Sequence, residues 1–286
     1  MSWKRRGRNV AHGCLLLLAV CYSLLPIYFM FIQSLKTAEE DVVGHPLIVT
    51  RPTLENYRHL FEPDPESEFL VRPPVAFPVW VQNTVVVFGA SLALTLALSL
   101  LAAYGLGRLR PPGWRWSRRL LFATYVVPHT LLFVPLYELA VRFGLDNSQL
   151  ALVIVYPMLS MPFCVWILSA FFQTLPREIE ESAYIEGASR VAAFLHIVLP
   201  MSRPVLVAAG LFTLGTISSD IVFASILLHS SEIQTVVAGL GAMDVSLEEL
   251  TVLAGINLAG IPLILLSALF ARGYVRGLTA AMVEGA

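Results

Sequence analysis

Polar and apolar positions in this chain are grouped into long blocks rather than alternating over short distances. Each of six blocks is apolar over about 20 residues, which is the length that a helix needs to cross a bilayer. The blocks cover residues 10–34, 82–107, 120–141, 150–172, 205–228 and 250–274. Prolines lie inside four of them, and membrane helices tolerate proline where neighbouring groups bond the freed carbonyls. The pattern predicts an all-α, polytopic membrane protein with six transmembrane helices.

Composition supports this fold class. Hydrophobic residues make up 57% of the 286 residues and charged residues only 14%, with a mean hydropathy of +0.73. A soluble domain carries about 25% charged residues. Cys14, Cys21 and Cys164 lie inside apolar blocks without metal-ligand spacing, so we expect neither a metal site nor a disulfide. The basic start resembles a signal peptide, but the first apolar block continues to about Gln33 without a small-residue cleavage site, which predicts an uncleaved span.

The distribution of Lys and Arg predicts the orientation. Of the 19 basic residues, 14 lie before the first block, after the second, between the fourth and fifth, or at or beyond the end of the sixth. Positive residues accumulate on the cytoplasmic side of membrane proteins. We therefore expect both termini in the cytoplasm of a prokaryote, with the chain in its inner or plasma membrane and in contact with lipid. The net charge of −1 points to no class of partner, and nothing in the chain indicates nucleic acid.

Two segments on the opposite side are longer than plain connectors. Residues 35–81 carry eight acids and many prolines, and residues 229–249 are glycine-rich. Loops of such length are usually functional or disordered. The first is expected to fold over the outer mouth or to meet a partner. The second is expected to dip back into the membrane mouth or to contact a partner. A solvated loop is the alternative for both.

Residues 174–203 form the longest cytoplasmic loop, and their composition is helical. Pro176 suits the first turn of a helix. Carboxylates near that positive helix end are stabilised. Three acids occupy this region: Glu178, Glu180 and Glu181. The pattern predicts one helix through Glu186, a bend at Gly187, and a second helix that Pro200 ends.

The first of these two helices has an acidic polar face. An amphipathic helix lying on an anionic inner leaflet would need basic residues there, but this one carries four acids against Arg177. Ala183 and Gly187 are four residues apart, so we expect one small-residue face that another surface approaches closely. The composition favours docking into a basic groove on a protein over binding to lipid.

The spacing in this segment resembles the cytoplasmic loop of ABC importer permeases. That loop reads Glu-Ala-Ala, three residues, Gly, nine residues, Ile-x-Leu-Pro. The positions that match the pattern or precede its glycine are Glu181, Ser182, Ala183, Glu186, Gly187, Ile197, Leu199 and Pro200. Ser182 and Glu186 depart conservatively from the usual Ala and Asp. Other segments extend the resemblance over almost the whole chain, including "PTLENYRHLF", "VPLYELAVRFGLDNSQLALVIVY" and "FASILL".

The C-terminal tail, residues 276–286, resembles that of carbohydrate permeases of the maltose-permease type, with departures at Ala281, Met282 and Glu284. The resemblance implies the type I ABC importer fold in a single permease domain, residues 1–286. It also implies a second permease subunit, giving a heterodimer, two ATPase subunits and an extracytoplasmic substrate-binding protein. The chain has no phosphate-binding loop and no catalytic nucleophile–base set, so we expect no enzymatic activity and no bound cofactor. ATP and Mg²⁺ would bind the ATPases.

The candidate substrate path centres on Asp220, the one acid deep inside a predicted span. A membrane carboxylate usually faces a cavity or a partner. The alternatives are a hydrogen bond to a sugar hydroxyl and a structural bond to the other subunit. Three neighbours carry hydroxyl groups: Thr216, Ser218 and Ser219. The aromatic residues Tyr156, Phe163 and Trp166 either stack on sugar rings or pack.

Function has one leading interpretation and several alternatives. The leading one is a permease subunit for a di- or oligosaccharide. The same machine importing glycerol phosphate, polyamine or another small polar solute is the nearest alternative. An ion-coupled secondary transporter would need paired intramembrane charges and inverted repeats, and the chain shows one clear acid and no obvious repeat. A membrane sensor or scaffold is the remaining alternative.

Overall fold

A computed structural model describes the backbone of residues 2–63, 73–243 and 245–282, and the side chains from residue 12 to residue 270 within these ranges, except 245–247. Every regular element in this part of the chain is a helix, which confirms the all-α class. The chain forms two compact units. The first comprises Met1–Pro78 and Ala242–Ile261, and the second comprises Val79–Gly241 and Pro262–Ala286.

The first unit contains α1 (Ser2–Gln33), α2 (Ala38–Val43), α3 (Glu55–His59) and the start of α14 (Val245–Met282). The segment after α1 is folded around buried polar groups. Lys36 is fully buried, and its Nζ donates to the carbonyl of His45 at 3.0 Å. The Asn56 amide donates to the carbonyls of Ser34 and Lys36 at 2.9 and 2.8 Å. The described part of residues 35–81 is therefore not a solvated loop, while residues 64–72 lie outside the described part.

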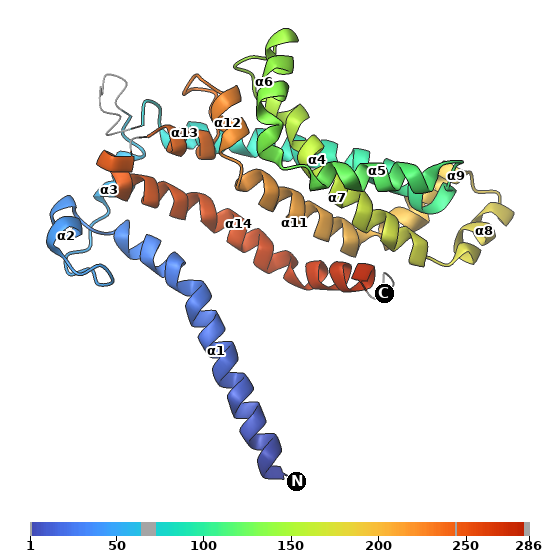
Figure 1. The fold of residues 1–286 in the computed structure, drawn as a ribbon, viewed down its shortest axis with the longest axis horizontal. Coiled ribbons are helices and arrows are strands. Elements are labelled where there is room, and N and C mark those ends of the chain that lie inside the picture. The colour runs from blue at the N-terminus through green and yellow to red at the C-terminus, as the bar shows by residue number, and fades with distance from the viewer. Residues whose placement is uncertain (1, 64–72, 244, 283–286) are drawn as a thin grey trace. The chain divides into compact units, whose positions relative to one another are not determined.

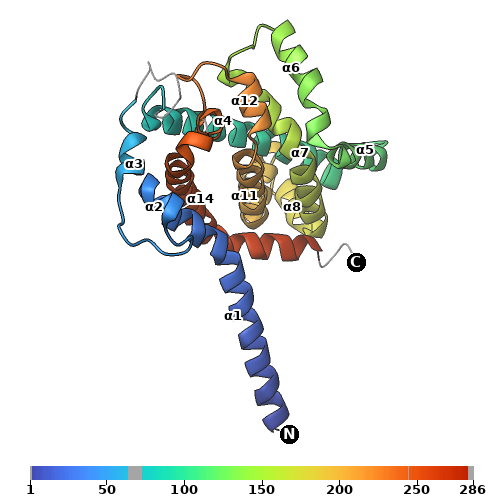
Figure 2. The same ribbon diagram turned by 60° about the vertical axis from the view of Figure 1, so that its left-hand side comes forward.

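In the second unit, α7 (Gln149–Thr174) lies side by side with α5 (Trp114–Val126) and α11 (Arg203–Ser218) (Figures 1 and 2). Further elements of this unit are α4 (Phe77–Tyr104), η1 (Gly105–Leu109), η2 (His129–Leu131), α6 (Phe133–Arg142), α12 (Val222–Leu227) and α13 (Val236–Ala242). Helix α7 has no polar face, and more than half of its residues are buried. It packs against α5 and α11.

Four helices in the described residues are long and apolar enough to cross a membrane: His12–Gln33, Phe77–Leu109, Gln149–Thr174 and Glu248–Phe270. They correspond to the predicted first, second, fourth and sixth spans. The prediction of an unbroken third span over residues 120–141 is wrong. Proline has no N–H and forces the preceding residue out of helical geometry. Val127 is accordingly extended before Pro128, and the segment divides into α5, η2 and α6.

The predicted fifth span over residues 205–228 is also divided. Helix α11 ends at Ser218, and α12 begins at Val222. At its start, α11 is bent by 73° from the helical segment Arg190–Met201, and the two together count as one further candidate span. Apolar composition therefore located these segments but not the breaks within them.

The second predicted outer segment is folded back onto α4 and the turn before α7. The Trp80 indole N–H donates to the carbonyl of Ser231 at 2.8 Å, and the Asn83 amide donates to the carbonyls of Glu232 and Gln234. The Oδ1 atom of Asn147 accepts the N–H groups of His229 and Ser230, at 2.8 and 3.0 Å. A solvated loop is therefore the wrong interpretation for residues 229–241.

Candidate functional site

The predicted cytoplasmic segment begins with α8 (Arg177–Ile185), which lies at the far end of α7 from α12 (Figure 1). A break at Leu175 and Pro176 separates α7 from α8. Leu175 is extended, as residues before proline are, and Pro176 has φ −55°. The first turn carries Glu178 and Glu180, whose charges are favourable near a helix N-terminus. The predicted helix start after Pro176 is confirmed.

Helix α8 ends in a Schellman motif centred on Gly187. The N–H of Ala188 donates to the carbonyl of Ala183 at 2.9 Å, and that of Gly187 donates to Tyr184 at 3.1 Å. Gly187 has φ +91°, a conformation that favours glycine. The predicted bend at this residue is therefore confirmed, and its cause is the left-handed backbone conformation.

A second helical segment follows the bend. Ser189 caps α9 (Arg190–Ala193) by accepting the N–H of Ala192 on its Oγ at 3.2 Å. The segment continues through the π-helical turn η3 (Phe194–Val198) into α10 (Leu199–Met201). The prediction that Pro200 ends the helix is wrong. Because η3 uses wider i→i+5 bonds, the helix accommodates the missing N–H of Pro200 and bends only after Met201.

The residues that match the family pattern differ in exposure. The exposed residues are Glu181, Ser182, Glu186, Gly187 and Pro200. Ile197 and Leu199 are half-buried, and Ala183 is buried. Ala183 faces the interior of its own unit, whereas Gly187 is exposed beyond the helix end. The predicted small-residue face shared by these two is therefore wrong. The exposed face of α8 instead carries Glu181 and, one turn on, Ile185, which is 88% exposed.

Glu180 does not join the exposed acids, contrary to prediction, because it points inward. Its Oε2 accepts the Nε–H of Arg108 at 2.8 Å, and the two side chains are 10% and 7% exposed. The Arg108 Nη1 and Nη2 groups donate to the carbonyls of Leu175 and Pro176 at 2.7 and 3.0 Å. This pair joins residues 72 positions apart, so no local spacing in the sequence signals it.

The residues of the candidate substrate path bond mainly to their own backbone. The hydroxyls of Thr216 and Ser219 donate to the carbonyls of Phe212 and Thr216, both at 3.0 Å, and Ser218 donates to Leu214. Such side-chain bonds to the preceding turn are ordinary for Ser and Thr in helices. The Oδ1 atom of Asp220 accepts the N–H of Phe223 at 3.4 Å, at the start of α12. The four residues therefore form a helix end and a helix start.

Part of Asp220 lacks a hydrogen bond within the described residues. Its Oδ2 atom is buried and bonds to no group there. The side chain of Tyr156, which is 1% exposed, lies close to this carboxylate. The structure thus gives the acid a capping role within its own chain, which the sequence alternatives did not include.

Comparison with known proteins identifies the family. The model of the family described as "binding-protein-dependent transport system inner membrane component" matches residues 108–280, more than half of the 286 residues. The chain belongs to this family. It is therefore an ABC transporter permease, a membrane protein that serves as a transport subunit.

Relatives of this permease match it over nearly its whole length. The inner membrane ABC transporter permease protein YcjP of Escherichia coli is 29% identical over 99% of both chains. The trehalose/maltose transport system permease protein MalG of Thermococcus litoralis is 28% identical over 96% of this chain and 95% of that one. A solved bacterial ABC transporter involved in importing the acidic polysaccharide alginate shares the fold, with a TM-score of 0.77 at 18% identity, covering 95% and 98% of the two chains.

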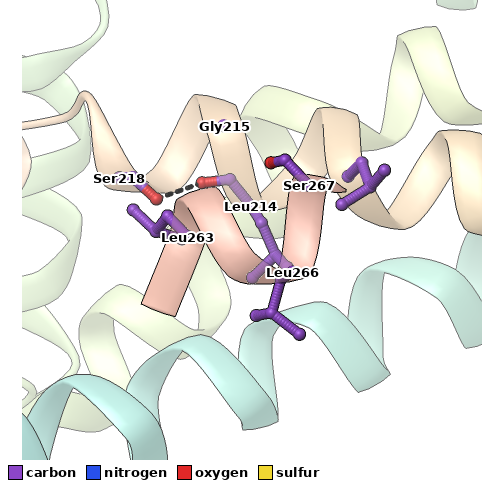
Figure 3. A pocket seen from close by; sticks show the side chains of 7 residues that line it. Leu214, Gly215, Ser218, Leu263, Leu266 and Ser267 are labelled. Atoms are coloured by element: carbon purple, nitrogen blue, oxygen red, sulfur yellow. Dashed lines mark hydrogen bonds between the residues drawn. The ribbon is translucent and has the colours of Figure 1, made fainter. Parts of the chain in front are cut away.

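A small pocket of the permease lies between α11 and the later part of α14 (Figure 3). Its volume is about 90 Å³, and its polar lining comes from Ser218 and Ser267, among leucines and Gly215. Ser218 is thus the one predicted path residue that lines this pocket. Among the described residues, no group of three or more His, Cys, Asp or Glu side chains is placed to hold a metal ion.

Proposed function

We propose that this permease is one membrane subunit of an ATP-driven importer for a sugar delivered by a binding protein. The relative from Thermococcus litoralis is named for trehalose and maltose, and the structural neighbour belongs to an alginate importer. The family description itself names dependence on a binding protein. A di- or oligosaccharide is therefore the substrate class that we propose, with a second permease subunit completing the path.

The coupling part of the proposal rests on the exposed face of α8. Glu181 and Ile185 lie one turn apart on it, and Ile185 is 88% exposed. A large apolar side chain beside a carboxylate suits a protein groove with an apolar wall and a basic residue. We assign that groove to the ATPase subunit, where Glu181 makes a charge-assisted hydrogen bond.

In this mechanism α8 and the segment after Gly187 move with the ATPases as they close on ATP and Mg²⁺. The motion changes which side of the membrane the path faces. The distribution of basic residues supports a cytoplasmic position for α8 and both termini. Residues 283–286 of the predicted tail lie outside the described residues, as do the side chains of residues 276–282.

The test is uptake into vesicles that hold this permease with its partner permease, ATPases and binding protein. Radiolabelled trehalose and maltose are the probes for the sugar class, and glycerol 3-phosphate is the probe for the alternative cargo. We expect ATP-dependent sugar uptake that Glu181→Lys abolishes. Glu138→Lys is the control for charge reversal outside α8, because Glu138 is an exposed carboxylate of α6; the change also removes its ion pair with Arg142. Full uptake by Glu181→Lys would refute the coupling role, and uptake driven by an ion gradient without ATP would refute the importer itself.

A further inference from the structure

The guanidinium of Arg108 contacts three groups at the base of α8. It donates to the Glu180 carboxylate at 2.8 Å and to the carbonyls of Leu175 and Pro176 at 2.7 and 3.0 Å. The Leu175 carbonyl lies in the break between α7 and α8, where it has no helical partner, and Pro176 is the N-cap residue of α8. One planar side chain therefore bonds both the break and the first turn of α8.

The ion pair is buried at both ends. The side chains of Arg108 and Glu180 are 7% and 10% exposed. A buried pair adds little stability over well-packed apolar residues, but losing one partner is costly because the other charge is left unpaired. Such a pair therefore penalises arrangements of α8 in which the two groups separate, and it favours a single orientation of the helix.

Arg108 itself projects from a rigid part of the chain. The preceding Gly107 packs so closely against α7 that a Cβ atom there would lie 2.8 Å from the carbonyl oxygen of Ser169. Tyr104, one turn earlier, packs against Phe172 and Phe194 with ring centroids 5.9 and 4.7 Å away. The end of α4 is thus fixed to α7 and η3, and Arg108 extends this fixed surface to α8.

We infer that Arg108 is a positioning residue, which holds α8 in the orientation that the ATPase engages and transmits its movement to α4. The inference rests on the proposed coupling role of α8 and adds the membrane-side connection that this role requires. Glu181 meets the ATPase on the exposed face, and Glu180 meets Arg108 on the buried face. These two adjacent acids therefore connect α8 to two different partners, the ATPase and Arg108.

Hydrogen exchange of the purified full chain tests the positioning role without any transported solute. We expect Arg108→Gln to speed the exchange of α8 amides by about tenfold or more, while those in the middle of α7 stay unchanged. Arg110→Gln is the matched control, because Arg110 is exposed, its Nε donates to the nearby carbonyl of Gly107 and its guanidinium lies over the Trp114 ring, so neither contact involves α8. Unchanged exchange in α8 would overturn the inference.

The reconstituted importer supplies a second readout. We expect Arg108→Gln to raise the ATP hydrolysed per molecule of labelled trehalose or maltose imported at least severalfold, and Arg108→Lys to restore part of the coupling. If Arg108→Gln lowers thermal stability but leaves the ATP hydrolysed per imported sugar unchanged, Arg108 has only a structural role. Arg108→Lys and Glu180→Gln serve the same test if Arg108→Gln does not reach the membrane.

The two proposals fail in different ways. If Glu181→Lys leaves uptake intact, α8 is not the coupling element and the proposed function fails. If Glu181→Lys blocks uptake while Arg108→Gln changes neither the exchange nor the ratio, only the positioning role fails.

Discussion

Replacing Gly187 isolates the contribution of backbone conformation at the end of α8. A Cβ atom at this residue would meet no other atom within 4 Å, so alanine introduces no clash. The φ of +91° is instead the source of the penalty. A non-glycine residue in the left-handed region costs about 1–2 kcal/mol. Asparagine tolerates the region better than alanine, and a β-branched residue tolerates it worse.

We therefore expect stability of the α8 end to fall in the order glycine, asparagine, alanine, valine. For Gly187→Ala, about 1 kcal/mol corresponds to roughly fivefold faster opening of the last turn. Hydrogen exchange of residues 183–188 measures this opening, and the uptake assay reports whether coupling falls in the same order.

Gly144 supplies a matched control from the same chain. It ends α6 in the same Schellman geometry, with bonds from Gly144 to Val141 and from Leu145 to Ala140, and it has φ +69° and open space around its Cβ position. Gly144→Ala should cost a similar amount at α6 and leave α8 and transport unchanged. Equal exchange in the alanine and asparagine variants of Gly187 would refute the conformational explanation, and an equal loss of transport in Gly144→Ala would refute its link to coupling.

Three further outcomes follow from the structure. Gly239→Ala should destabilise the α13 region by about 1–3 kcal/mol in a thermal unfolding assay, because its Cβ would meet the buried Trp80 ring. Unchanged unfolding would contradict this contact. The N–H and hydroxyl of Thr50 and the N–H of Arg51 donate to the Glu40 carboxylate and lower its pKa. The stability that these bonds give the folded state is complete above the ordinary pKa of about 4.3, and it is lost as the pH falls through the lowered pKa. Amide exchange around α2 should accelerate in acid, and Glu40→Gln should remove that pH dependence. Asp220→Ala should cost about 1 kcal/mol through the lost cap of α12, while Asp220→Asn retains most of it; equal melting temperatures for the two variants would argue against capping.

Features that depend on local chemistry were predictable from the sequence. The continuous apolar blocks gave four helices at nearly the predicted positions. Proline and glycine act on their own backbone, so the start of α8 after Pro176 and the turn at Gly187 followed from neighbouring residues alone. The breaks at Pro128 and Asp220 were not predicted, because hydrophobicity indicates whether a segment lies in an apolar environment and not whether its backbone forms one continuous helix.

Features that depend on distant contacts were not predictable. Arg108 counted only as one charge among the basic residues that set orientation, and Glu180 only as one acid near a helix start. Their separation of 72 positions conceals the ion pair. Likewise, lysine is rarely fully buried in proteins, whereas Lys36 is fully buried and bonded to the carbonyl of His45.

Two structural features set the geometry of α8, one its length and the other its orientation. The Schellman turn at Gly187 fixes where the helix ends, and the Arg108–Glu180 pair fixes which face turns inward. Because residues four apart share a helix face, setting one residue inward also determines where Glu181 and Ile185 point. In the proposed coupling, α8 needs both a fixed length and a fixed orientation to transmit the movement of the ATPase to the membrane helices. Loss of the turn at Gly187 should therefore shorten the surface that the ATPase engages. Loss of the ion pair should leave that surface intact but let α8 rotate. Hydrogen exchange of amides in the first turn of α8 distinguishes the two effects.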